Sequence, residues 1–175
     1  MCRRLLMKSP CHTARPRLLL NLFPDAKFVY IHRNPYEVFL SGAHMASTTY
    51  GYCFLQRPTD KDLQEYILRQ GEILIGEYVS CVDDGILGKH NSVELSFEEL
   101  TMNPYETMKK IYSALGLDSF DENSSSSYPN ILENECVKLK GYKKNVFGEN
   151  ILKDELIAEI KERWAEHFSR YGYCP

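Results

Sequence analysis

Long apolar runs are absent from the 175 residues. No stretch approaches the roughly 20 apolar residues of a membrane-spanning helix, so the sequence predicts no membrane segment. Residues 1–9 are basic but lack the apolar core of a secretory signal peptide, and a cytoplasmic location is the first expectation. No G-x-x-x-x-G-K-[ST] segment is present, which argues against a nucleotide kinase. Without internal repeats, a chain of this length is expected to form one domain.

Nucleic acid is a poor candidate partner, because the net charge is −3 and basic and aromatic residues do not interleave. The charge is unevenly distributed. Residues 1–24 hold five basic side chains and no acid, whereas residues 60–135 hold 16 acids and five bases. Residues 138–144 then add four lysines and no acid. Two basic clusters around an acidic middle predict an anion or carboxylates between them, or else two solvated surface patches.

Cysteine is present but fits neither a metal site nor an obvious disulfide framework. The six cysteines, at positions 2, 11, 53, 81, 136 and 174, are scattered and match no metal-ligand spacing. We expect reduced thiols and no bound metal.

The most informative stretch is residues 8–41. An apolar segment around Leu18 predicts a helix that ends at Pro24, because proline disfavours helical geometry before it. Residues 28–31, FVYI, then predict a short buried strand. Asn34 is placed to cap the next helix and Pro35 to occupy its first position. Open α/β sheets bind anions where a parallel strand feeds a helix N-terminus, and Arg33 lies at that point.

The remaining apolar patterns complete an α/β fold with a parallel sheet and flanking helices. They predict a strand at 4–7, and this strand would make 4–32 a β-α-β unit. The further predicted elements are a helix over 35–46, a Thr59-capped helix to Val82, a strand at 92–97, a helix opened by a capping box at Asn103, and one continuous helix over 152–171.

Several segments together resemble the sulfotransferase family that uses 3′-phosphoadenosine 5′-phosphosulfate, especially its broad branch with an LKSPxH segment. The resemblance rests on KSPCHT at 8–13, FPDA at 23–26 through HRNP at 32–35 and Ser41, LSFEEL at 95–100 followed by NP at 103–104, YKKN at 142–145, and RW at 163–164 to YGY at 171–173. It implies a P-loop NTPase-like sulfotransferase fold.

The resemblance also implies roles for residues in the donor site. Arg33 and Ser41 would hold the 3′-phosphate, which identifies the nucleotide and does not react. Arginine presents a planar fork of donors suited to phosphate, and the serine hydroxyl adds one hydrogen bond. Lys140, beside Gly141, would close over the same phosphate.

The expected reaction moves a sulfuryl group to a hydroxyl or amine of a small-molecule or glycan acceptor. By resemblance, Lys8 lies near the bridging oxygen and His12 is the base that accepts the acceptor's proton. Such a transfer depends mainly on positioning and on stabilising the charge of the leaving phosphate.

Each assignment has a structural alternative. Arg33 is otherwise a surface or carboxylate-paired arginine, Ser41 an ordinary helix residue, and His12 a first-turn or capping histidine. The lysines at 138–144 are otherwise a solvated face. Phe97 fits the core better than a nucleotide contact.

The sequence departs from the family before Lys8, where relatives have a strand and a phosphate-binding loop. We therefore expect 1–175 to be a single partial domain, truncated at its N-terminus and weak or inactive alone. The lost strand is expected to leave a free sheet edge prone to self-association. The alternative is an inactive remnant that serves as a nucleotide-binding or protein-interaction module. A Golgi location stays open if an N-terminal anchor is missing.

Overall fold

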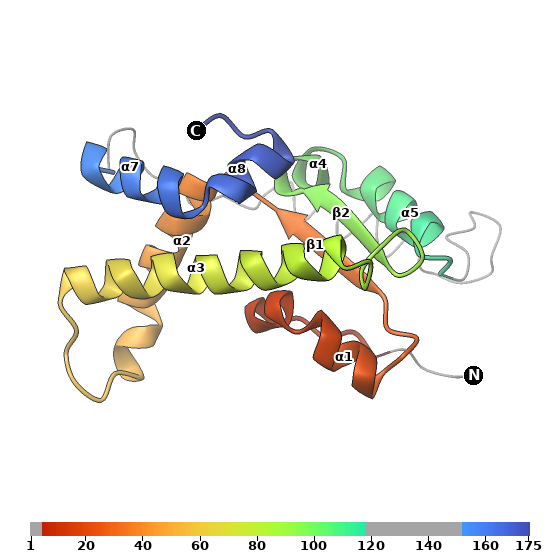
Figure 1. Cartoon of the computed structure of the whole chain (residues 1–175), viewed down its shortest axis with the longest axis horizontal. Coiled ribbons are helices and arrows are strands. Elements are labelled where there is room, and N and C mark those ends of the chain that lie inside the picture. The colour runs from red at the N-terminus through yellow and green to blue at the C-terminus, as the bar shows by residue number, and fades with distance from the viewer. Residues whose placement is uncertain (1–4, 118–151) are drawn as a thin grey trace.

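The computed structural model describes residues 5–117 and 152–175 (Figure 1). The elements follow one another as η1 (Pro10–Ala14), α1 (Pro16–Leu22), β1 (Phe28–His32), α2 (Pro35–Thr48), η2 (Tyr50–Tyr52), α3 (Asp60–Asp83), β2 (Ser92–Ser96), α4 (Phe97–Met102), α5 (Pro104–Ala114), α7 (Asp154–Arg163) and α8 (Ala165–Tyr171), where η marks a 3₁₀ helix. None of the helices in these two ranges is long and apolar enough to span a bilayer.

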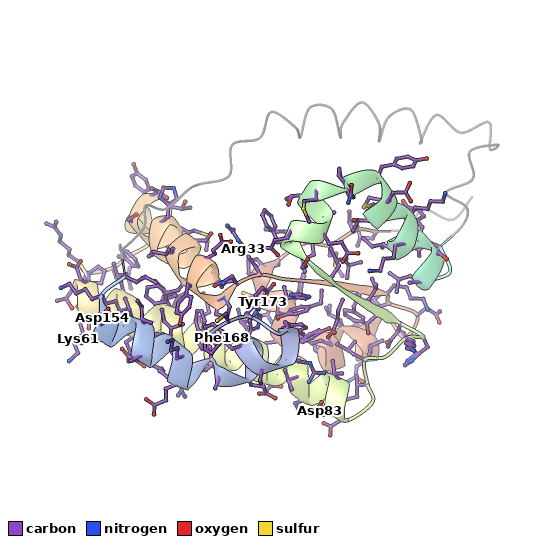
Figure 2. All side chains as sticks on the ribbon, turned by 90° about the horizontal axis from the view of Figure 1, so that it is seen from above. Arg33, Lys61, Asp83, Asp154, Phe168 and Tyr173 are labelled. Atoms are coloured by element: carbon purple, nitrogen blue, oxygen red, sulfur yellow. The ribbon has the colours of Figure 1, made fainter. Side chains whose placement is uncertain are left out.

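The strands β1 and β2 pair in parallel, with Phe28 opposite Ser92 and His32 opposite Ser96. Figure 2 shows α4 and α5 on one side of this pair and α3 and α8 on the other. The predicted α/β fold with a parallel sheet and flanking helices is therefore confirmed. Both strands lie close to where the sequence places them.

The predicted strand at 4–7 is wrong for residues 5–7, the part that the structure describes. Leu5 and Leu6 are 78% and 94% exposed, and the described residues of the sheet are those of β1 and β2 alone. A strand gains its stability from a pairing partner and a buried face. Residues 5–7 have neither, so the β-α-β unit over 4–32 does not form.

The prediction that β1 is a buried strand holds for one face only. Tyr30 stacks on Tyr78 of α3, with ring centroids 3.8 Å apart. On the other face, α5 covers Leu95 of β2 but leaves Val29 and Ile31 of β1 44% and 45% exposed. The edge strand therefore combines an aromatic, packed face with an aliphatic, open one.

The principal core lies where α2, α3, α7 and α8 meet. Its buried members come from all four helices and are Phe39, Ile67, Leu68, Ile160, Trp164 and Phe168. Ion pairs reinforce the contact between α7 and α3, because Arg163 Nε donates to Glu72 Oε1 at 2.6 Å and Arg163 Nη1 donates to Glu65 Oε2 at 2.6 Å.

Two of the predicted helix caps are present in the structure, and a third is absent. Thr59 and Asp62 form the capping box of α3, and the Asn34 side chain caps α2. The capping box predicted at Asn103 is absent, since the Asn103 side chain makes no cap hydrogen bond. The chain has already entered α4 directly after β2, where Ser96 Oγ accepts from the Glu99 amide at 3.0 Å.

The predicted continuous helix over 152–171 is wrong, because the chain breaks at Trp164 into α7 and α8. Trp164 leaves helical geometry at φ −112° and ψ 23°. Its indole Nε1 donates to the Leu68 carbonyl at 3.1 Å, and its ring lies over Gly71 of α3. Trp164 joins α7 to α8, and the docking of its indole on α3 thus overrides the helical periodicity of the sequence.

Two glycines of α3 provide a matched test of this docking. A Cβ at Gly71 would lie 2.2 Å from Trp164 Cζ2, whereas a Cβ at Gly76 would have no neighbour within 4 Å. We predict that Gly71→Ala lowers the free energy of unfolding by about 1–3 kcal/mol through overpacking. Gly76→Ala should raise it by up to about 1 kcal/mol, because alanine favours the helix. Denaturant unfolding measures both, and equal effects would contradict the docking of Trp164 over Gly71.

Candidate functional site

The turn between β1 and α2 carries the candidate anion site. β1 ends at His32, and α2 begins at Pro35 with Asn34 as its cap. Asn34 Oδ1 accepts from the Tyr36 amide at 2.9 Å. This cap fixes the helix start directly beyond the carboxyl end of a parallel strand, which is where α/β sheets bind ligands. Arg33 lies between the two elements, as the sequence predicts.

The Arg33 side chain is held on two sides and is only 18% exposed. Its Nε donates to Glu37 Oε2 at 2.5 Å, one helical turn further along the chain. Its guanidinium carbon lies 4.6 Å from the centroid of the half-buried Phe97 ring, a cation–π geometry. The carboxylate-paired arginine that the sequence left as an alternative is therefore present. The pairing uses Nε, however, and a guanidinium has five donors.

Two of the unpartnered buried polar atoms belong to residues of this turn, and a third belongs to a histidine bonded to it. Among the described side chains, four buried polar atoms have no hydrogen-bond partner: Arg33 Nη2, Tyr36 Oη, His167 Nδ1 and His12 Nδ1. Arg33 and Tyr36 belong to the turn itself, and His167 is hydrogen-bonded to it. Buried polar groups in folded proteins are nearly all satisfied, so such orphans indicate a place where a polar ligand can bind.

The other predicted site residues that the structure describes are dispersed over the segment before η1, η1 itself and α2. Lys8 is exposed just before η1, and His12 lies in η1, which packs on α3. Ser41 is exposed on α2, in the second turn after the cap. Among the described residues no hydrogen bond joins Lys8, His12 or Ser41 to Arg33, and their convergence stays a prediction. Lys140 and Gly141 lie outside the described residues.

The described part of the chain shows neither a metal-ligand cluster nor a disulfide. Within residues 5–117 and 152–175, no group of three or more histidine, cysteine or acidic side chains is arranged to hold a metal ion. The four cysteines in those ranges, at positions 11, 53, 81 and 174, are unpaired, as expected for reduced thiols.

Sequence reasoning missed the contacts that the C-terminal residues make with β1. His167 Nε2 lies 3.0 Å from the Arg33 carbonyl, and His32 Nδ1 lies 2.7 Å from the Tyr173 hydroxyl. The Tyr171 ring stacks on His32 with centroids 4.0 Å apart. Figure 2 shows Tyr173 and Arg33 in the same region of the molecule. In β1, Tyr30 and His32 alternate with the aliphatic residues Val29 and Ile31. This pattern was the available signal that one face of the strand meets polar partners.

A carboxylate anchors the tyrosines of this face. The hydroxyls of Tyr78 and Tyr171 both donate to Glu94 Oε1, at 2.8 Å and 3.2 Å. Burial is the main cause that raises the pKa values of Tyr30, Tyr78 and Tyr171 above the ordinary value, and it raises the pKa of Tyr173 to about 12. All four rings are therefore neutral at physiological pH.

Burial also determines the charge of the two histidines. It lowers the pKa of His167 and that of His32 below the ordinary value, because the charged imidazolium is disfavoured away from water. A carbonyl oxygen can only accept, so Nε2 of His167 carries the proton and donates to Arg33. The neutral ring then has no proton on the unpartnered Nδ1.

These lowered pKa values predict that the protein loses stability in mild acid. The unfolded chain takes up protons below about pH 6.5 that the folded histidines resist, so the free energy of unfolding should fall as pH drops from 7.5 to 5.5. His167→Gln removes one of these groups and should flatten the slope. His90→Gln, at an exposed histidine, should keep the wild-type slope. Denaturant unfolding at several pH values measures it, and an unchanged slope for His167→Gln would refute the assignment.

Comparisons with known proteins place the chain in a family. The model of the sulfotransferase family matches residues 1–122. The omega-hydroxy-beta-dihydromenaquinone-9 sulfotransferase Stf3 of Mycobacterium bovis is 30% identical over 98% of this chain and 42% of its own length, and its Mycobacterium tuberculosis counterpart gives the same values. Sulfotransferase 2A1 of Macaca fascicularis is 30% identical over 67% of this chain and 45% of its own length. No solved structure matches.

This chain therefore spans less than half the length of the curated relatives it matches. The family match extends over the whole segment from η1 to α5, including the turn that carries Arg33. Because the match covers more than half of the chain and the relatives agree with it, the chain belongs to the sulfotransferase family.

Proposed function

We propose that this chain carries part of the site for 3′-phosphoadenosine 5′-phosphosulfate in a sulfotransferase that modifies a hydroxyl or amine. The observation that carries the proposal is the buried, unpartnered Nη2 of Arg33 beyond the end of β1. A buried guanidinium nitrogen without a partner is costly, and a phosphate oxygen would satisfy it.

The contacts of Arg33 favour such a ligand. Glu37 takes Nε and the Phe97 ring supports the guanidinium plane, so the side chain is held in one orientation before any ligand binds. Rigid presentation of a donor lowers the entropic cost of binding. Glu37 thus orients the guanidinium and leaves Nη2 for the nucleotide. In this proposal Ser41 adds a hydroxyl to the same 3′-phosphate, together with Lys140 and Gly141.

The remaining residues act on the reacting groups. When bound, the nucleotide supplies the sulfuryl group. Lys8 is proposed to offset negative charge on the leaving phosphate. His12 is proposed to accept the proton of the acceptor, and no group among the described residues is hydrogen-bonded to its buried Nδ1.

The proposed acceptor is a small molecule or glycan. The name of Stf3 describes a sulfotransferase for an omega-hydroxy compound, which favours a hydroxyl over an amine as the acceptor group here.

Nucleotide titration tests the proposal. We predict that 3′-phosphoadenosine 5′-phosphate binds at least about tenfold more tightly than 5′-AMP, because a charge-assisted hydrogen bond contributes about 1.5–3 kcal/mol. Arg33→Ala should abolish the preference. Arg69→Ala removes an exposed arginine of α3 and should leave it intact. Isothermal titration calorimetry measures both affinities. Equal affinities of the wild-type protein for the two nucleotides would contradict a 3′-phosphate site at Arg33.

A second candidate function is that of an interaction module, favoured by the open face of β1. Within the described residues β1 pairs only with β2, and Val29 and Ile31 are nearly half exposed beside its free edge. An unpaired edge with an aliphatic face can pair with another chain. We propose self-association through this edge as the mode of interaction.

Light scattering coupled to size-exclusion chromatography tests self-association. We predict a concentration-dependent dimer that Ile31→Lys weakens at least about tenfold, because a charge on the interface must be desolvated. Val38→Lys changes an exposed valine of α2 and serves as the control. A wild-type monomer at all concentrations, or equal effects of the two variants, would contradict the edge as an interface.

A further inference from the structure

We propose that His167, Tyr171 and Tyr173, here called the C-terminal clamp, are positioning residues that fix the backbone of Arg33 for its ligand. The inference rests on the proposed function, since it concerns the geometry of the same phosphate-binding arginine. It assigns to the last residues of the chain a part in donor binding, although none of them is proposed to touch the nucleotide.

The first contact of the clamp holds the carbonyl group on the C-terminal side of Arg33. His167 is 4% exposed and donates from Nε2 to the Arg33 carbonyl at 3.0 Å. That carbonyl belongs to the peptide unit joining Arg33 to the helix cap Asn34. The hydrogen bond therefore fixes the orientation of the peptide plane from which the turn into α2 departs.

The second contact of the clamp holds His32, the residue before Arg33. The Tyr171 ring covers one face of the His32 imidazole at 4.0 Å, and the Tyr173 hydroxyl is hydrogen-bonded to His32 Nδ1 at 2.7 Å. Tyr171 is itself held by Glu94 of β2 at 3.2 Å. The C-terminal segment thus holds His32, the residue before Arg33, and the carbonyl group of Arg33 itself.

The return of the chain at Gly172 makes both contacts possible. Gly172 adopts φ 67° and ψ 25°, and the Tyr173 amide donates to the Phe168 carbonyl at 3.0 Å. This left-handed turn closes α8 and folds Tyr173 back over His167, with the two rings parallel to within 5°. Phe168 is buried in the principal core, so the clamp is attached to a rigid base.

Positioning matters because a charge-assisted hydrogen bond to phosphate depends on its geometry. Supporting residues that do not touch a ligand commonly set the affinity of those that do. The Arg33 side chain is tied to Glu37 and Phe97, which lie on α2 and α4. Movement of the Arg33 backbone against these partners would withdraw Nη2 from its ligand. The clamp prevents that movement.

The test uses Tyr173→Phe, which removes one hydroxyl, and His167→Leu, which removes the donor to Arg33. His167→Gln keeps a donor near the position of Nε2 and should rescue binding. Tyr66→Phe is the control, because Tyr66 is exposed on α3 and, among the described residues, its hydroxyl accepts from Gln70. For each variant, calorimetry gives the ratio of the affinities for 3′-phosphoadenosine 5′-phosphate and 5′-AMP, and thermal unfolding gives the stability.

We expect Tyr173→Phe and His167→Leu to lower the affinity ratio about two- to tenfold, the effect of one misplaced hydrogen bond. His167→Gln and Tyr66→Phe should keep the wild-type ratio. If both clamp variants lower the melting temperature but keep the ratio, the clamp has a structural role only and the inference is overturned. A wild-type ratio of one would overturn the proposed function, and this inference with it.

Discussion

The docking of Trp164 on α3 determines where the C-terminal helices α7 and α8 lie. The indole donates to the Leu68 carbonyl and occupies the space that Gly71 leaves free. Because the helix is interrupted at this residue, α8 departs from the direction of α7 and reaches the end of β1 (Figure 1). A buried hydrogen bond of one side chain thus sets the position of the residues that surround the candidate site.

The local features of the fold could be predicted from the sequence, whereas the docking contacts could not. Thr59, Asn34 and the apolar runs at 28–31 and 92–97 act through neighbouring residues, and the structure agrees with them. The strand expected at 4–7 and the continuous helix over 152–171 failed, because a strand needs a pairing partner and a helix yields to a docked tryptophan. Local pattern carries no information about either tertiary condition.

In the candidate site, too, the local features could be predicted from the sequence and the tertiary contacts could not. The place of Arg33 followed from the strand, the cap and Pro35. Its ion pair with Glu37 was visible as an i, i+4 spacing, although the sequence did not specify which alternative applied. His167 and Tyr173 lie more than 130 residues from the residues they contact, so no local pattern could connect them. Family membership implies the P-loop NTPase-like fold, and the parallel strands and flanking helices are consistent with it.

The two unlike faces of β1 have a consequence for strand register. A shift of one residue against β2 would turn Val29 and Ile31 towards α3 and expose Tyr30 and His32 to water. Burial of aliphatic surface would favour the shifted pairing, since the open face is the aliphatic one. Polar and ring contacts to Tyr78, Tyr171 and Tyr173 oppose it. Alignment of this strand is therefore enforced by aromatic packing, to which Phe28 and Tyr30 contribute, and by hydrogen-bond complementarity rather than by aliphatic burial.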